Sequence, residues 1–325
     1  MNILFILNSA GRDAYSAMTR VSMASVRATN PGCRIALLTD KQTERNLIST
    51  GDCVLDEADR CIIKSVGSDC PQYANRFLKT RSRELINGPF LYLDSDTIVR
   101  GDLSPICSLK ADLCGAKNDQ GPSTLLQMGG NTAIFDAMQW PYPVGPYING
   151  GVLFLSDSSA CHRFAKTWHR LWLESHEKTG LHFDQPALNR AISLSGVSFE
   201  LMSNTYNAQI TANPQSAASA VLWHYYGSSP NKTLLESDRV ISKLIKNQAL
   251  DHNVISRLIT HFHPWRRGSF IDDMAAFNLL NSANLDKTAR DWINRTGRHW
   301  KAAIKIFSHR CRAQIYAAVR RMTDQ

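Results

Sequence analysis

The feature that most constrains the fold is a regular alternation of short apolar runs with helical patterns in the first part of the chain. Continuous apolar runs predict buried strands over 3–7, 34–39 and 90–93. Helical patterns over 14–29 and 72–87 lie between these runs. An alternation of this kind is typical of an α/β fold with a mostly parallel central sheet and flanking helices.

The alternation continues less regularly to about residue 232. In chain order, the further predicted elements are a helix over 41–50, strands near 61–64, 112–116 and 148–155, helices over 158–177 and 184–195, and a strand over 220–225. Residues 118–147 are rich in glycine, proline and aromatic residues and are expected to form a long loop. Mostly helical patterns follow. We therefore predict two parts, an α/β domain over 1–235 and a helical C-terminal region over 236–325.

Composition excludes several protein classes. The chain has 325 residues, of which 43% are hydrophobic and 20% charged, which excludes a disordered, collagen-like or coiled-coil chain. It has no apolar run of about eighteen residues, so no membrane-spanning helix is expected. Residues 1–11 lack the pattern of a secretory signal, and the eight cysteines are scattered without a CxxC pair. We therefore expect a cytoplasmic protein with reduced thiols.

Most of the net charge lies at the C-terminal end. Lys and Arg number 37 and Asp and Glu number 28, which gives a formal net charge of +9. Residues 290–325 hold nine of the basic residues and two of the acids, which is +7 and leaves +2 for residues 1–289. Because the body of the protein is nearly neutral, no nucleic-acid partner is expected.

The tail has the pattern of a basic amphipathic helix. Apolar residues recur at helical spacing from Trp300 to Met322, and basic residues lie off that stripe. Such a helix over 299–322 is typical of contact with a membrane surface, which would place the protein on the inner face of the cytoplasmic membrane. A packed helix with a solvated basic face explains the pattern equally well, so this alternative stays open.

Two carboxylates follow the third strong strand. The apolar run over 90–93 leads directly into Asp94, Ser95 and Asp96, at the strand end where open α/β sheets bind ligands. Two acids this close repel each other unless a cation or hydrogen-bond donors neutralise them. A hard divalent cation such as Mg²⁺ or Mn²⁺, which typically bridges carboxylates and a diphosphate, would do so. A pair of turn acids without a ligand is the plainer alternative.

Three further motifs carry polar residues next to predicted elements. Asn149 precedes Gly150 and a second glycine within a strand, a pattern that often marks the close approach of a ligand or of another backbone. Asp184 and Gln185 begin a helix, where Asp184 would either cap the helix or point at a substrate. His224, near the end of the last strand, would either complete a metal site or be an ordinary core or surface histidine.

In this order and spacing, the four motifs resemble glycosyltransferase family 8, which includes bacterial lipooligosaccharide galactosyltransferases and the glycogenins. LYLDSDTIV resembles the strand and DxD motif of the family, YINGGVLFL its F-N-A-G-V segment, FDQPALN its D-Q-x-x-L-N helix start, and HYYG its H-x-x-G segment. Tyr206-Asn207 adds a weaker match. The resemblance covers about residues 1–235. It implies a GT-A fold for that part and transfer of a hexose from a nucleotide sugar with retention of the anomeric configuration.

The resemblance also implies a metal site and a nucleoside site. Asp94, Asp96 and His224 would hold Mn²⁺ or Mg²⁺, and this ion would bind the diphosphate of the donor. Asn8 and Tyr15, at the end of the first strand and the start of its helix, would contact the nucleoside.

Other residues would complete the donor site on the same resemblance. Lys79 would approach the diphosphate or the sugar, with Arg76 as a competitor for the same role, and Lys232 would contact phosphate. The remaining residues expected to touch the donor or line the sugar pocket are Ser95, Asn149, Gly150, Asp184, Gln185 and Gly227. Among these, Asn149, Asp184 and Gln185 are the candidates for a catalytic role. The expected partners are a nucleoside-diphosphate sugar, in particular a UDP-hexose, and a saccharide or glycolipid acceptor of the lipopolysaccharide type.

Two other functions remain open on the sequence alone. A phosphatase of the haloacid dehalogenase type also has a strand followed by D-x-D, but there the motif lies near the N-terminus, and the segments around Gly150 and His224 would have no role. A non-catalytic glycan-binding scaffold on a GT-A fold would keep the fold and lose turnover. The intact set of Asp94, Asp96 and His224 argues against the scaffold.

Overall fold

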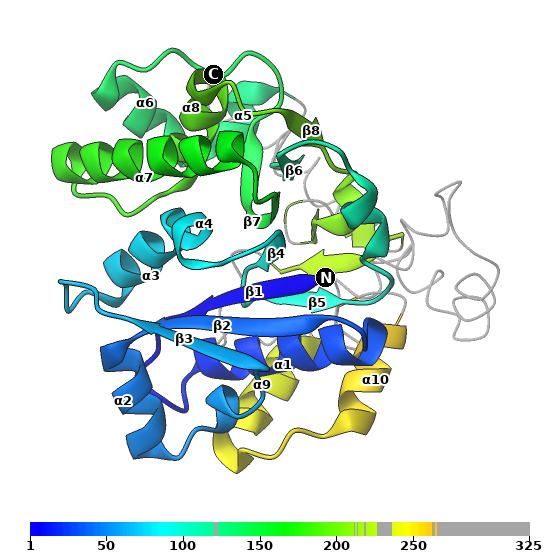
Figure 1. Cartoon of the computed structure of the whole chain (residues 1–325). Coiled ribbons are helices and arrows are strands. Elements are labelled where there is room, and N and C mark those ends of the chain that lie inside the picture. Colours follow the sequence, from blue (N-terminus) through cyan, green and yellow to red (C-terminus); the bar gives the residue numbers. More distant parts are fainter. Residues whose placement is uncertain are drawn as a thin grey trace, which may run out of the picture.

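The computed structural model describes residues 1–119, 123–210, 214–217, 219–225 and 236–261, together with residues 212 and 264. Helices and strands alternate through this part of the chain, and helices lie on both faces of a central sheet (Figure 1). No helix among the described residues is long and apolar enough to cross a membrane.

The central sheet has seven strands in the order β3-β2-β1-β4-β7-β6-β8. Their bounds are β1 (Asn2–Leu7), β2 (Arg34–Asp40), β3 (Arg60–Lys64), β4 (Phe90–Leu93), β6 (Leu113–Lys117), β7 (Ile148–Leu155) and β8 (Phe199–Leu201). Strands β3, β2, β1 and β4 are mutually parallel, and β8 is parallel to β6. Strand β7 runs antiparallel to both of its neighbours, β4 and β6. The prediction of a mostly parallel sheet is therefore confirmed, with β7 as the reversed strand.

The helices cover both faces of this sheet. Their bounds are α1 (Ala14–Thr29), α2 (Lys41–Thr50), α3 (Pro71–Thr80), α4 (Ser82–Leu85), α5 (Thr124–Met128), α6 (Thr132–Met138), α7 (Ser159–Thr179), α8 (Gln185–Ser195), α9 (Glu236–Asn247) and α10 (His252–Thr260). Short 3-10 turns are η1 (Cys53–Leu55), η2 (Ser104–Ser108), η3 (Gly129–Asn131), η4 (Asn204–Tyr206) and η5 (Pro214–Ala217).

Strand β1 shows why both faces need a cover. Leu4 and Ile6 point into a core that includes side chains of α3, α7 and α8. Ile3, Phe5 and Leu7 point into a second core that includes side chains of α1 and α2. Because successive side chains of a strand face opposite sides, a continuous apolar run is buried only when both sides are covered.

A second, smaller sheet has the order β5-β10-β9, formed by β5 (Thr97–Val99), β10 (Leu222–His224) and β9 (Ala208–Gln209). Strand β10 is antiparallel to β5 and parallel to β9. This sheet shares a third core with α1, α9 and α10, in which Trp223 is fully buried. Since β5 begins directly after Asp96, its pairing with β10 brings a distant part of the chain to the carboxylates.

Three expectations about elements need correction or stay open. The helix expected over 72–87 is two helices, α3 and α4, separated at Arg81, where the backbone leaves helical geometry (φ −96°, ψ 0°). The segment 118–147, expected to be a loop, contains α5 and α6 in its described part. The predicted boundary at residue 235 lies outside the described residues and stays a prediction.

Candidate functional site

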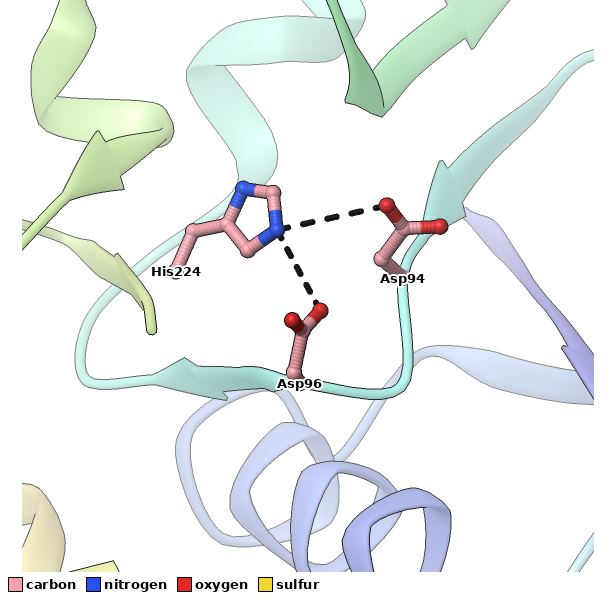
Figure 2. A group of neighbouring side chains, drawn as sticks. All are labelled: Asp94, Asp96 and His224. Carbon is pink, nitrogen blue, oxygen red and sulfur yellow. Dashed lines mark ion pairs between the residues drawn. The ribbon is translucent and has the colours of Figure 1, made fainter. Parts of the chain in front are cut away.

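The turn between β4 and β5 holds Asp94 and Asp96 at the carboxyl end of β4. The N–H of Asp94 donates to the carbonyl of Gly151 (2.8 Å), and the hydroxyl of Thr97 donates to the carbonyl of Asp94 (2.8 Å). On the other side, the N–H of Tyr225 donates to the carbonyl of Asp96 (3.0 Å). The two bonds between backbone groups tie the turn to β7 and to the residue after β10, and both carboxylates point into the same space (Figure 2).

Strand β10 brings His224 to the same place. The pairing of β10 with β5 sets His224 opposite Thr97. The imidazole Nε2 then lies 3.2 Å from Asp96 Oδ1 and 3.9 Å from Asp94 Oδ2 (Figure 2). One ligand atom from each of the three residues lies within 4.8 Å of the others. The structure therefore brings together the three residues that were predicted to hold a metal ion.

The charges at this point favour a cation. Burial by itself would raise the pKa of Asp96, but the adjacent His224 holds that pKa below its usual range. Burial by itself would lower the pKa of His224, but Asp96 raises it. The carboxylates thus stabilise positive charge at the imidazole edge. Two carboxylates and an imidazole are a donor set that suits Mn²⁺, and the carboxylates suit Mg²⁺, so the residues present fit a divalent ion.

The second glycine of β7 makes this close packing possible. A Cβ atom on Gly151 would lie 2.3 Å from Cε1 of His224 and 2.7 Å from Oδ2 of Asp94. A Cβ on Gly150 would meet nothing nearer than 3.5 Å. The paired glycines are therefore not equivalent, because Gly151 alone of the two lies directly against the predicted metal ligands.

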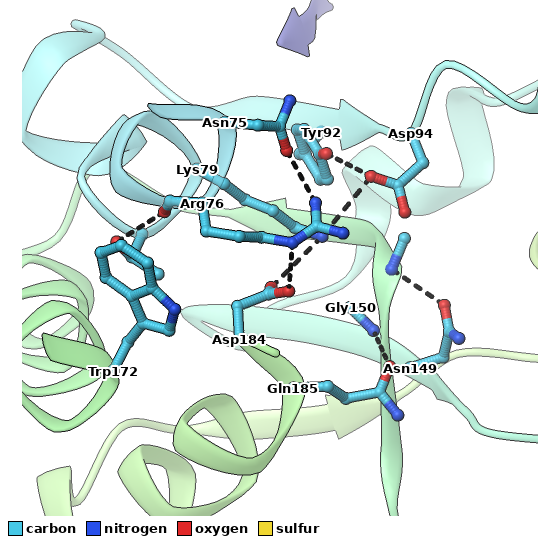
Figure 3. A network of polar contacts seen from close by, with 12 residues as sticks. Asn75, Arg76, Lys79, Tyr92, Asp94, Asn149, Gly150, Trp172, Asp184 and Gln185 are labelled. Atoms are coloured by element: carbon cyan, nitrogen blue, oxygen red, sulfur yellow. Dashed lines mark hydrogen bonds and ion pairs between the residues drawn. The ribbon is translucent and has the colours of Figure 1, made fainter. Parts of the chain in front are cut away.

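A second group of charges lies beside Asp94 (Figure 3). Lys79, a buried residue of α3, has its Nζ 3.4 Å from Asp94 Oδ1 and 3.3 Å from Asp184 Oδ2. Arg76, one turn earlier on α3, has its Nε 3.1 Å from Asp184 Oδ1. The hydroxyl of Tyr92 donates to Asp94 Oδ1. Lys79 and Arg76, which the sequence left as competitors, thus both contact Asp184, while only Lys79 of the two also contacts Asp94.

Asp184 occupies the N-cap position of α8 but does not act as a cap. Its backbone is already in the helical region (φ −90°, ψ −20°), and its side chain makes no capping hydrogen bond. The capping role considered from the sequence is therefore wrong, because the carboxylate turns towards α3 and pairs with its cations. Trp168 fixes the backbone here, since its indole N–H donates to the carbonyl of Asp184 (3.0 Å).

Gln185 and Gly150 contact each other. The side-chain oxygen of Gln185 accepts a hydrogen bond from the N–H of Gly150 (3.2 Å) (Figure 3). The start of α8 is thereby attached to β7, next to the charges around Asp184. Asn149 lies on the same strand but is only 2% exposed. Its amide bonds to buried neighbours, Asn118 and Asn207, and to the N–H of Gly151.

The predicted nucleoside contacts lie at the carboxyl end of β1. Asn8 is buried, and its amide donates to Asp40 Oδ2 (2.9 Å). Tyr15 is 59% exposed at the start of α1. A pocket adjoins this end of the sheet and is lined by Ser9, Ala10, Asp40, Gln42, Thr43, Asn46, Ser68, Asp69, Cys70 and Pro71. Ser95 connects this region to the carboxylates, because its hydroxyl accepts from Thr19 of α1 (2.8 Å).

Some predicted residues lie outside the described part of the chain. These are Gly227, Lys232 and the tail at 299–322.

Two residues of the site, Asp40 and Asn118, were not predicted. Both come at or just after the end of a predicted strand. Because polar residues that follow the strands of an α/β sheet gather at one edge, this position was a signal that the sequence offered.

Known proteins resemble this chain in structure. No protein-family model matches it, and no curated protein matches it in sequence. The galactosyltransferase LgtC, solved in complex with donor and acceptor sugar analogs, superposes with a TM-score of 0.50 at 18% identity, over 79% of this chain and 100% of LgtC. The bifunctional glycosyltransferase WbbM in its apo form superposes with a TM-score of 0.54 at 12% identity, over 79% of this chain and 51% of WbbM. The GT-A fold expected from the motifs is thereby confirmed.

Proposed function

We propose that this protein is a metal-dependent glycosyltransferase that moves a hexose from a nucleoside-diphosphate sugar, in particular a UDP-sugar, to a saccharide acceptor. The observation that carries the proposal is the meeting of Asp94, Asp96 and His224 at one edge of a GT-A fold. Open α/β sheets bind their ligands at this edge, beyond the carboxyl ends of the strands. LgtC, which shares the fold, is a galactosyltransferase.

The residues around the triad have complementary roles in this proposal. Mn²⁺ or Mg²⁺ bound by the triad would supply a Lewis acid for the departing nucleoside diphosphate. Lys79, between Asp94 and Asp184, would donate to a diphosphate oxygen. Asp184 would keep Arg76 as its counter-charge and accept a hydrogen bond from a sugar hydroxyl. Gln185 would turn its amide N–H₂ to the sugar while its oxygen stays on Gly150.

The nucleoside would occupy the pocket at the ends of β1 and β2. The lining of this pocket includes Ser9 and Ala10, directly after Asn8, and Asp40 at the end of β2. The exposed ring of Tyr15 would contact the base or ribose from the start of α1. Among the lining residues, Gln42 and Asn46 carry amides that suit the hydrogen-bonding edges of a base and the hydroxyls of a ribose.

The acceptor and the stereochemistry follow from the motif resemblance. The acceptor would be lipopolysaccharide or another surface glycan, and the transfer would retain the anomeric configuration. The basic tail at 299–322 would contact the anionic inner surface of the cytoplasmic membrane. In this proposal Gly227 and Lys232 would contact the diphosphate.

A panel of nucleotide sugars tests the proposal. The purified protein would be incubated with Mn²⁺ and each donor, and release of the nucleoside diphosphate would be followed with and without EDTA. We expect release from a UDP-sugar, its loss with EDTA, and its loss in Asp96→Ala and His224→Ala. The exposed residues Asp56 and His252 provide matched control substitutions to Ala, which should leave release unchanged.

Other outcomes would identify the competing functions. Release of phosphate from simple phosphomonoesters, without release from any nucleotide sugar, would favour the phosphatase. The site does not favour that function, because His224 beside both carboxylates would have no role in it. Metal-dependent binding of a donor without turnover against any acceptor or water would favour the scaffold.

A further inference from the structure

A row of buried amide side chains runs from His224 across β7 to the first residues after β6. Asn207 Oδ1 lies 2.8 Å from His224 Nδ1, and Asn207 Nδ2 donates to Asn149 Oδ1 (3.0 Å). Asn149 Nδ2 donates in turn to Asn118 Oδ1 (3.1 Å). Asn118 Nδ2 then donates to the backbone carbonyl of Gln127 in α5. We call Asn207, Asn149 and Asn118 the amide row.

Two backbone groups set the direction of every hydrogen bond in the amide row. The N–H of Gly151 donates to Asn149 Oδ1 (2.8 Å), so that atom must be the amide oxygen. The atom of Asn207 that meets this oxygen must then be its nitrogen, which leaves the oxygen of Asn207 facing His224. At the far end, the carbonyl of Gln127 can only accept, so Asn118 faces it with nitrogen and faces Asn149 with oxygen. The N–H of Gly151 and the carbonyl of Gln127 therefore require the same donor-to-acceptor direction along the amide row.

This direction determines which nitrogen of His224 carries a proton. An amide oxygen on Nδ1 requires that Nδ1 be the donor, so Nε2 is the nitrogen that faces Asp94 and Asp96. A metal-binding histidine needs this arrangement, with an N–H held on one side and a lone pair presented on the other. We propose that Asn207, Asn149 and Asn118 are positioning residues that hold the imidazole of His224 in the orientation and tautomer required for metal binding.

Burial makes the amide row rigid. Asn207 is 0% exposed, Asn118 is 1% and Asn149 is 2%, so water has little access to replace a lost partner. A fully bonded buried network has one stable arrangement, whereas removing one member leaves its neighbours without partners. The inference rests on the proposed function and changes the expected role of Asn149 within it, from contact with the sugar to support of a metal ligand.

Binding of Mn²⁺ tests the inference. Electron paramagnetic resonance of free Mn²⁺ would measure the affinity of the parent protein and its variants, with and without UDP. Loss of an outer partner of a ligating histidine typically costs about 10- to 100-fold in metal affinity, and we expect this loss in Asn207→Ala. Asn207→Asp keeps an acceptor for His224 Nδ1 but loses the donor to Asn149 Oδ1, so its affinity should fall less than that of Asn207→Ala. Asn204→Ala, a half-buried neighbour outside the row, is the matched control.

Nitrogen NMR of the histidine rings supplies a second readout on the parent protein itself. In the Mg²⁺-bound protein, the inference requires a protonated Nδ1 on His224 and no proton on Nε2. A proton on Nε2 with a bare Nδ1 would overturn it, whether or not Asn207→Ala folds. Unchanged Mn²⁺ affinity in a folded Asn207→Ala would also overturn it, while leaving the proposed transferase intact. A parent protein that binds no Mn²⁺ with or without UDP would instead contradict the proposed function. The NMR measurement on the metal-free protein, at a pH where the imidazole is neutral, would still report which ring nitrogen carries the proton.

Discussion

At the scale of single residues, the contrast between Gly150 and Gly151 shows how closely β7 approaches the triad. The sequence indicated that paired glycines mark a close approach, but it did not distinguish the two positions. The distinction depends on which glycine faces His224 and Asp94, and that is decided by the pairing of β4 with β7 and of β5 with β10.

Alanine at Gly151 should abolish metal binding, while alanine at Gly150 should be tolerated. The new Cβ at 151 would overlap His224 and Asp94, whereas the Cβ at 150 would make ordinary contacts and leave the N–H bonded to Gln185. Calorimetric titration with Mn²⁺, after circular dichroism has shown that both variants fold, measures the difference. Equal Mn²⁺ affinity in the two variants would show that Gly151 does not pack against His224 and Asp94 as closely as described.

Lys79 is the cation that lies between the predicted metal site and Asp184. It contacts two carboxylates from a buried position, and nothing in its sequence context distinguishes it from Arg76. Only the geometry shows that Lys79 pairs with both Asp94 and Asp184, while the ion pair of Arg76 is with Asp184.

Lys79→Met should raise the KM for the donor about 10- to 100-fold, because a hydrogen bond to a charged group contributes about 1.5–3 kcal/mol. Steady-state kinetics on the preferred nucleotide sugar would measure it. Lys79→Arg should not restore the parent value, because the guanidinium is larger and planar where a compact ammonium fits between two carboxylates. A KM for the donor within twofold of the parent in Lys79→Met would show that the ammonium does not contact the donor.

At the scale of elements, the long apolar strands and amphipathic helices were predictable, and the short elements were not. Helix α7 shows a clear stripe in the sequence, and its tryptophans at 168 and 172 are fully buried in the structure. Strands β5 and β9 have three and two residues, too few for any pattern to identify them. Their pairing with β10 is a long-range contact, so the position of His224 beside Asp96 was inferred from motif resemblance and not from periodicity.

His169 on α7 should make stability depend on pH. Burial lowers its pKa from the usual 6.5 to about 4. The groups packed around it are the Thr80 hydroxyl and the rings of Phe77 and Trp172, with Arg81 and Glu84 as the nearby charges. Because the unfolded chain binds the proton more tightly, stability should fall as the pH decreases from about 6.5 to about 4.

Urea unfolding at several pH values in this window would compare the parent with His169→Gln. The variant should lose less stability on acidification than the parent, because it lacks the buried imidazole that takes up a proton more readily in the unfolded chain than in the folded protein. His252→Gln, at an exposed position on α10, is the control and should follow the parent. Parallel pH profiles for the parent and His169→Gln would show that His169 does not have the lowered pKa.

At the scale of the whole molecule, the fold class could be predicted from the pattern of apolar runs and helices, whereas the strand order could not. Apolar runs without alternation require a sheet covered on both faces, and helices between them make the strands parallel. The reversed direction of β7 was not predicted, because an apolar strand carries no mark of its direction. The packing of α9 and α10 on α1 and on the second sheet was also not predicted, because a helical pattern does not show which element the helix packs against.

Asp94, Asp96 and His224 should together bind a divalent ion that holds a nucleoside diphosphate. Crystals grown with UDP and Mn²⁺, measured at a wavelength where manganese scatters anomalously, would show whether they do. We expect an anomalous peak in contact with both carboxylates and with Nε2 of His224, and with diphosphate oxygens on its open side. A structure with UDP bound and manganese absent from the triad, or coordinated by other residues, would contradict it.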